Sequence, residues 1–397
     1  MYAQTSAIWA LWAKKGKPGE MTWLPLPQHL LDTARVARLL WRRWLPASVR
    51  HLIENDLDNP ELGEELLVFL AASHDIGKST PVFISKQRGF LPDDLDSQIL
   101  DGLRAAGLPA EPFSFFINSA QTPHALATQA LLERWGCDHR IALILGAHHG
   151  KPSPQASDGA ALIAQYPNHY HLGANGRDAW QAAQSELLDL ALQQGDFESL
   201  DQLPVPGFFA QVLLTGLVIM ADWIASNERL FPYWTYGEPF TPVLDGSRAD
   251  TAWKKLDLPP PWHTDGSDPA LDYYQARFKI STPYPAQAEA LAIAQQIAAP
   301  GIMILEAPMG SGKTEVALVM AEIFAEKVQK AGVLFALPTQ ATSNAIFPRL
   351  LDWTRQLEID EAYSVRLAHG KAQFNEGYRQ LMEGSSHVGE TAEDAVV

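Results

Sequence analysis

The chain has 397 residues, of which 47% are hydrophobic, so it can form two or three domains with cores of their own. Its formal charge of −16 at pH 7 excludes a broadly basic nucleic-acid-binding coat, but not a local stripe of Lys and Arg. The single cysteine, Cys137, excludes an intrachain disulfide framework and indicates a reducing cytoplasm.

No membrane association is expected from the sequence. Residues 1–16 lack the basic start and apolar core of a signal peptide. The longest apolar run, residues 207–221, contains Gln211 and is too short to span a bilayer. It is therefore predicted to form a buried helix.

The first 235 residues predict an all-α domain. Apolar periodicity indicates helices at 64–73, 125–135, 141–149 and 208–226, and a further helical pattern begins near Leu26. A proline-rich linker is predicted for residues 236–282.

The pattern changes after the linker. A helix at 286–298, a strand at 301–306, a glycine-rich loop, a helix at 314–330 and a strand at 333–337 follow in order. This order predicts the opening of a parallel α/β sheet over residues 283–384. The small, acidic tail 385–397 is predicted to be disordered.

Histidines and aspartates form the most informative pattern in the chain. Imidazole and carboxylate together suit a borderline transition metal better than magnesium. The potential ligands are too many for one ion but enough for two ions that share a carboxylate: His29, His74, Asp75, His124, His148, His149 and Asp222. A lone histidine on an apolar helix is more often a core residue, but the adjacent pair His148-His149 favours a shared cluster at a helix end.

Asp75 and Lys78 are the candidate catalytic residues. Lys78 follows His74 by one helical turn, where it is either a solvated helix cap or a charge that neutralises a phosphate oxygen. Two bridged ions would supply a nucleophile at neutral pH and hold a phosphate, so hydrolysis of a phosphate ester is the predicted chemistry.

A phosphate-binding loop is predicted at residues 307–314. Ala307 stands where the pattern G-x-x-x-x-G-K-[ST] has its first glycine. The residues that would bind ATP and Mg²⁺ are otherwise present, namely Gly310, Ser311, Gly312, Lys313 and Thr314.

On these residues, with His148-His149-Gly150 and Ala221-Asp222-Trp223, the chain resembles the type I CRISPR-associated nuclease-helicases, in which an HD nuclease is fused to a superfamily-two helicase. The second half adds stretches similar to the Q motif, motif I, motif Ia and a stretch that follows it: residues 283–287, 307–314, 338–342 and 367–371. The short segment before His29 favours subtype I-E.

The resemblance implies an HD domain followed by the first part of a RecA-like lobe. It implies single-stranded DNA cleavage by two ions of iron, manganese, cobalt or nickel, 3′-to-5′ unwinding driven by ATP, and recruitment by the crRNA-guided Cascade complex. A cytoplasmic monomer is expected.

The resemblance also assigns residues to sites. The first ion maps onto His29, His74, Asp75 and Asp222, and the second onto Asp75, His124, His148 and His149. It places Gln287 at the adenine, and Thr339, Gln340 and Thr342 at DNA.

The motor departs from the family pattern. The nearest candidate for the D-E-x-H Walker B motif, residues 360–363, lacks the histidine and a preceding apolar strand, and the second lobe with its arginine fingers is not found. The chain is expected to stop inside the first motor lobe. Two other functions stay open: an HD nucleotide phosphohydrolase with a regulatory P-loop, and a non-catalytic fragment that docks on Cascade.

Overall fold

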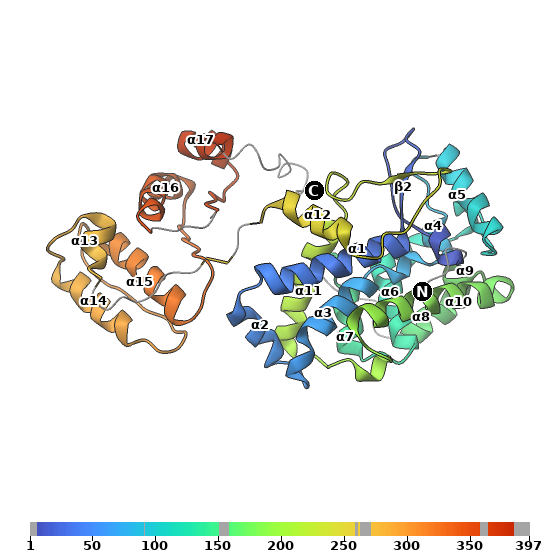
Figure 1. The fold of residues 1–397 in the computed structure, drawn as a ribbon, viewed down its shortest axis with the longest axis horizontal. Helices are drawn as coiled ribbons and strands as arrows, with labels where there is room; N and C mark the ends of the chain where they lie inside the picture. Colours follow the sequence, from blue (N-terminus) through green and yellow to red (C-terminus); the bar gives the residue numbers. More distant parts are fainter. Residues whose placement is uncertain are drawn as a thin grey trace. The chain divides into compact units, whose positions relative to one another are not determined.

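The computed structural model describes residues 6–90, 92–150, 159–258, 261–262, 271–357 and 364–384. The chain forms two compact units, Met1–Arg42 with Arg50–Lys255 and Arg43–Val49 with Leu256–Val397 (Figure 1). Two sequence predictions, the weak Walker B candidate at 360–363 and the disordered tail at 385–397, lie outside the described residues.

The first unit is mainly helical, as the sequence predicted. Its helices are α1 (Leu26–Leu39), α2 (Ala47–Glu54), α3 (Gly63–Ser73), α4 (Pro81–Ile84), α5 (Asp94–Ala105), α6 (His124–Arg134), α7 (His139–Gly146), α8 (Gly159–Gln165), α9 (Pro167–His171), α10 (Gly173–Gly195), α11 (Phe208–Ala225) and α12 (Ser247–Leu256). A π-helical turn, η2 (Leu40–Trp44), extends α1, and short 3-10 turns lie between several helices: η1 (Ala7–Ala10), η3 (Pro60–Leu62), η4 (Ile76–Lys78), η5 (Phe113–Phe115), η6 (Ser119–Gln121) and η7 (Leu200–Gln202).

Helix α3 is the central element of this unit. From Leu66 to Ser73 every one of its residues is buried, as expected for a helix that is apolar on all sides. It packs against α1, α7, α10 and α11. Since α3 ends directly before His74 and Asp75, this pair lies inside the domain rather than at its surface.

A small antiparallel sheet, which joins the start of the chain to a segment after α11, was not predicted. Its strands are β1 (Trp12–Lys15), β2 (Thr22–Pro25) and β3 (Trp234–Thr235), in the order β1-β2-β3. The strands have four residues or fewer, so alternation of side chains gives almost no signal in the sequence. The β1–β2 register shifts between Trp12 and Lys14, which makes Ala13 an extra residue in the ladder.

The predicted linker is partly structured. Residues 236–255 belong to the first unit and include all of α12 except its last residue. Arg248 of this helix forms an ion pair with buried Asp32 of α1 and lies over the ring of Trp234. These contacts fix the segment to the helical domain, which proline content alone could not reveal.

Helix α11 is less buried than the sequence predicted. One face contributes Leu214, Val218 and Asp222 to the interior, whereas Phe208, Val212 and Trp223 are exposed. Among the described helices it is the one long and apolar enough to cross a membrane by length and composition. Its packing against α1, α3 and α7 makes it part of the helical domain.

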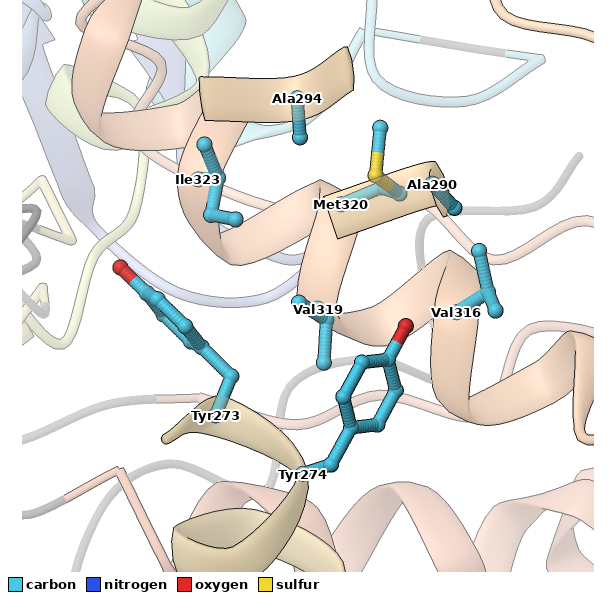
Figure 2. Packing of buried hydrophobic residues seen from close by; sticks show 8 residues of the cluster. All are labelled: Tyr273, Tyr274, Ala290, Ala294, Val316, Val319, Met320 and Ile323. Carbon is cyan, nitrogen blue, oxygen red and sulfur yellow. The ribbon is translucent and has the colours of Figure 1, made fainter. Parts of the chain in front are cut away.

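The second unit contains α13 (Tyr273–Phe278), α14 (Pro285–Gln296), α15 (Lys313–Lys327), α16 (Gln340–Arg355), the 3-10 turn η8 (Ala372–Phe374) and α17 (Glu376–Gly384). Figure 2 shows how α13, α14 and α15 share one apolar core, in which Tyr273 and Tyr274 lie against Val316, Val319 and Ile323. A smaller core joins Phe347 of α16 to Leu367 and Ala372.

The two predicted parallel strands do not form in the described part of this unit. Residues 301–306 and 333–337 have no strand partner there, and Ile302 and Leu334 are 93% and 90% exposed. A parallel sheet is stable only when several strands pair and both faces are covered. Periodicity can identify apolar segments that are suited to such a sheet, but it cannot supply their neighbours.

Gly77 allows the turn after α3 to approach α6 closely. A Cβ atom at this position would lie 2.0 Å from the carbonyl oxygen of His124 and 2.5 Å from the amide nitrogen of Thr128. Both obstacles are backbone atoms, so no rotation of a side chain can relieve the clash.

We therefore expect Gly77→Ala to lower the free energy of unfolding by at least about 1–3 kcal/mol, the usual cost of overpacking. The matched control is Gly216→Ala in α11, where a Cβ atom meets nothing within 4 Å and helix propensity favours alanine. Denaturant titration followed by circular dichroism measures both variants. Equal stability of the two would contradict the close approach.

Candidate metal centre

The seven predicted metal ligands come together in two neighbouring groups. His29 of α1, His74 and Asp75 at the end of α3, and Asp222 of α11 have ligand atoms within 4.8 Å of one another. His124 of α6 and the pair His148-His149 form the second group under the same limit. Residues separated by almost 200 positions therefore meet at one place in the helical domain.

Asp75 lies between the two groups. Its Oδ2 atom is 3.2 Å from Nε2 of His29 and 3.2 Å from Nε2 of His74. Its Oδ1 atom is 3.4 Å from Nε2 of His124 and 3.6 Å from Nε2 of His148. One carboxylate thus presents a different oxygen to each group, which is the arrangement of a bridging ligand.

Backbone carbonyls orient two of the imidazoles. Nδ1 of His74 donates to the carbonyl of Ala71 (2.8 Å), and Nδ1 of His148 donates to the carbonyl of Leu145 (2.6 Å). A proton held on Nδ1 leaves the lone pair on Nε2 free, as in most histidine ligands of metals. Both Nε2 atoms point into the shared site.

The donor atoms fit a metal because burial leaves them without hydrogen bonds. Nε2 of His29, His74 and His148 and Oδ1 of Asp75 are buried and lack a hydrogen-bond partner. Unsatisfied buried polar atoms are costly, and cations compensate that cost. The sets His29, His74, Asp75 and Asp222, and Asp75, His124, His148 and His149, could each hold one transition-metal ion.

The charges of the site also favour metal binding. Burial by itself would raise the pKa of Asp75, but the ammonium of Lys78 and the imidazolium of His74 hold it well below its usual range. Burial lowers the pKa of His74, but the carboxylates of Asp75 and Asp222 outweigh burial and raise this pKa to about 9, so a metal would displace a proton from His74. Burial lowers the pKa of His124 to about 2 and that of His148 to about 4. The bridging group is therefore a carboxylate and these two imidazoles are neutral at pH 7, which are the forms that ligate metals.

Lys78 is buried and fully engaged with its neighbours. Its Nζ atom lies 2.5 Å from Oδ2 of Asp75 and donates to the carbonyl of Ala13 (3.3 Å). These contacts favour a role in orienting the Asp75 carboxylate over direct neutralisation of a substrate phosphate.

Three supporting residues were missed by reasoning from the sequence. Thr128 accepts from the amide of Gly77 and donates to the carbonyl of His74, both at 2.9 Å, which ties the turn to α6. Ser226 donates to Asp222 (2.8 Å), and Lys14 lies 3.9 Å from the same carboxylate oxygen. None of the three stands in a recognisable motif, so only the fold identifies them.

The predicted phosphate-loop residues lie in a turn directly before a helix. Gly310 and Gly312 have φ values of 79° and 75°, which favour glycine, and the loop leads directly into the N-terminus of α15. Ser311 donates to the carbonyl of Pro308, and the ammonium of Lys313 donates to the carbonyls of Ala307 and Pro308. Thr314 lies in the first turn of α15.

Gln287 and the motif Ia residues occupy structural positions as well. The buried Gln287 side chain lies against the loop, with Nε2 3.4 Å from the carbonyl of Gly312. Thr339 caps α16 by accepting from the amide of Thr342, and Gln340 is exposed beside it. Helix capping accounts for the positions of Thr339 and Thr342 without any contact to DNA. Their role in DNA binding therefore stays a prediction.

Protein prepared without chelator is expected to contain up to two transition-metal ions per chain, measured by elemental analysis. His149→Gln removes one ligand of the second group and should lower the content towards one ion. His139→Gln, an exposed histidine of α7 that bonds Glu133, is the matched control and should change nothing. Wild-type protein without such ions, yet fully active in magnesium alone, would exclude the two-ion site.

Comparisons with known proteins agree with this geometry. The family model described as "Cas3, HD domain" matches residues 12–231, more than half of the chain. The CRISPR-associated nuclease/helicase Cas3 of Streptococcus thermophilus is 40% identical over 389 residues, which covers 94% of this chain and 41% of that protein. The CRISPR-associated endonuclease/helicase Cas3 of Thermus thermophilus is 31% identical over 414 residues, covering 98% of this chain and 41% of that protein.

A solved structure shows the same relationship. The crystal structure of T. fusca Cas3-ADP superimposes with a TM-score of 0.69 and 25% identity, covering 93% of this chain and 40% of that chain. The chain therefore spans about two fifths of the length of these relatives. With its HD residues gathered at one site and the family model matching over the same segment, the chain belongs to the Cas3 HD-domain family.

Proposed function

We propose that the helical domain is a metal-dependent nuclease that cleaves single-stranded DNA in CRISPR antiviral defence. The observation that carries the proposal is the Asp75 carboxylate, whose two oxygens face two different groups of histidines. Membership of the Cas3 HD-domain family supports the same chemistry. When two transition metals are bound, they supply a nucleophile at neutral pH and stabilise the charge on the phosphate.

The protein's own residues would hold and orient this centre. Asp75 would bridge the ions, and the ammonium of Lys78 would keep its carboxylate ionised and fixed. The carbonyls of Ala71 and Leu145 would keep His74 and His148 in the tautomer that leaves Nε2 free. Burial would exclude water from His29, His74 and His148, whereas the cluster is open at exposed His149 and at the partly exposed Lys14 beside Asp222.

We further propose that the second unit is the first part of a RecA-like helicase lobe that binds ATP with Mg²⁺. The positive φ angles of Gly310 and Gly312, the adjacent N-terminus of α15 and the position of Lys313 support phosphate binding. The whole protein would unwind DNA from 3′ to 5′ after recruitment by crRNA-guided Cascade in the cytoplasm. Monomeric state and subtype I-E stay predictions.

Nucleotide hydrolysis with a regulatory P-loop is the second candidate function. It uses the same metal chemistry, and a buried two-ion site accepts either phosphate ester. Substrate comparison separates the candidates, because a phosphohydrolase would prefer deoxynucleoside triphosphates to single-stranded DNA. A non-catalytic docking fragment would turn over neither substrate with manganese or nickel.

The chain should cut single-stranded DNA in the presence of a transition metal without ATP. Asp75→Ala should abolish cutting, because it removes the carboxylate that both groups share. Asp75→Asn is the companion variant, since alanine leaves the buried Lys78 ammonium without its partner, and Asp101→Asn at the surface is the control. Cleavage of a labelled oligonucleotide is measured, and a folded Asp75 variant with wild-type rates would disprove the bridge.

The polypeptide alone should show negligible ATPase stimulated by DNA, and no unwinding. Hydrolysis needs a carboxylate that holds Mg²⁺ and an arginine that stabilises the transition state, the latter worth roughly 10³–10⁵ in rate. No complete Walker B motif is present in the sequence. Phosphate release is measured with and without single-stranded DNA. Robust stimulation that Lys313→Ala abolishes would reveal a missed carboxylate or a partner chain that completes the motor.

A further inference from the structure

Three lysines close to the metal centre differ in how their ammonium groups are used. Lys78 is held by Asp75 and the carbonyl of Ala13. Lys15 is held by Asp96 and the carbonyl of Lys86, both at 2.6 Å. Among the described residues, Lys14 forms an ion pair with Asp222 alone, at 3.9 Å, which is beyond hydrogen-bond distance, and its side chain is 29% exposed. Lys14 thus keeps its donors available beside the cluster.

The β-bulge in β1 produces this difference. The register shift makes Ala13 an extra residue opposite β2, and its carbonyl accepts from Lys78. Successive side chains of a strand point to opposite faces, and the one-residue shift sets which face each takes: Lys14 faces Asp222, while Lys15 reaches Asp96. Bulges commonly re-aim a side chain next to an active site.

The charge balance of the centre gives Lys14 a reason to meet an anion. Two divalent ions would exceed the charge of the Asp75 and Asp222 carboxylates, and Lys14 and Lys78 add two more positive groups. Lys14 lies next to an oxygen of Asp222 that also faces His29 and His74. The single negative charge of Asp222 cannot balance both an ammonium and a divalent ion, so a further anion would be attracted to this edge.

Resting on the nuclease function proposed above, we propose that Lys14 is a substrate-positioning residue. Its ammonium binds a phosphate oxygen of the DNA strand at the edge of the centre formed by His29, His74 and Asp222. Such a contact is a charge-assisted hydrogen bond, and it reads no base sequence. Lys78 lies too deep in the protein to make it, because its ammonium is buried and occupied.

The test measures binding separately from cleavage. Metal-loaded protein is titrated with a fluorescent phosphorothioate oligothymidylate, which keeps the backbone charge and resists hydrolysis, at several salt concentrations. Lys14→Met should weaken binding by at least about tenfold and reduce the slope of log affinity against log salt by about 0.7, the loss of one phosphate contact. Lys14→Arg should restore both.

Lys17→Met is the matched control, because it removes the same charge from the exposed turn of the same hairpin. It should leave affinity and salt slope near wild-type values. If Lys14→Met behaves like Lys17→Met while wild-type protein cuts DNA, the positioning role of Lys14 is disproved and the nuclease function stands. Loss of metal from Lys14→Met would assign Lys14 to the structure of the metal site and would also overturn the proposal. Wild-type protein that neither binds nor cuts DNA would overturn both proposals.

Discussion

A carboxylate buried at the end of helix α3 is the constraint on which this domain depends. Asp75 is 1% exposed, and burying such a charge without compensation is prohibitive. The surrounding structure compensates it from three directions, with the ammonium of Lys78, the imidazoles on both sides and the sites for cations between them. Helices α1, α3, α6 and α11 must all be placed correctly for this compensation to hold.

This constraint explains why the turn after α3 has to lie close to α6. Gly77 has no Cβ atom because backbone of α6 occupies that space, and Thr128 links the two segments by hydrogen bonds. The approach brings His124, the first residue of α6, to the Oδ1 side of Asp75. Gly77 is therefore required by the packing of α6 against the turn, and this packing sets the position of the second group of ligands relative to the first.

The small sheet at the start of the domain serves the same centre. The extra residue in β1 offers its carbonyl to Lys78, and Lys14 follows beside Asp222. The segment that contains Arg248 is held to α1 and to Trp234 of β3, so residues beyond the predicted domain end complete the unit. The second unit has its own cores, built by α13, α14 and α15 and by α16 with the segment that follows.

The sequence by itself determined the helical character of residues 26–234, the seven metal-ligand candidates and the phosphate loop. Helical periodicity and motif spacing are local properties, so they can be read without the fold. Tertiary structure alone decided which oxygen of Asp75 faces which histidines. It also decided that the Lys78 ammonium pairs with this carboxylate, while the Lys14 ammonium lies beyond hydrogen-bond distance of Asp222. It also decided that α11 keeps an exposed apolar face and that the segments 301–306 and 333–337 stay unpaired in the described unit. These outcomes depend on neighbours distant in the chain, and neither spacing nor composition specifies which neighbours are present.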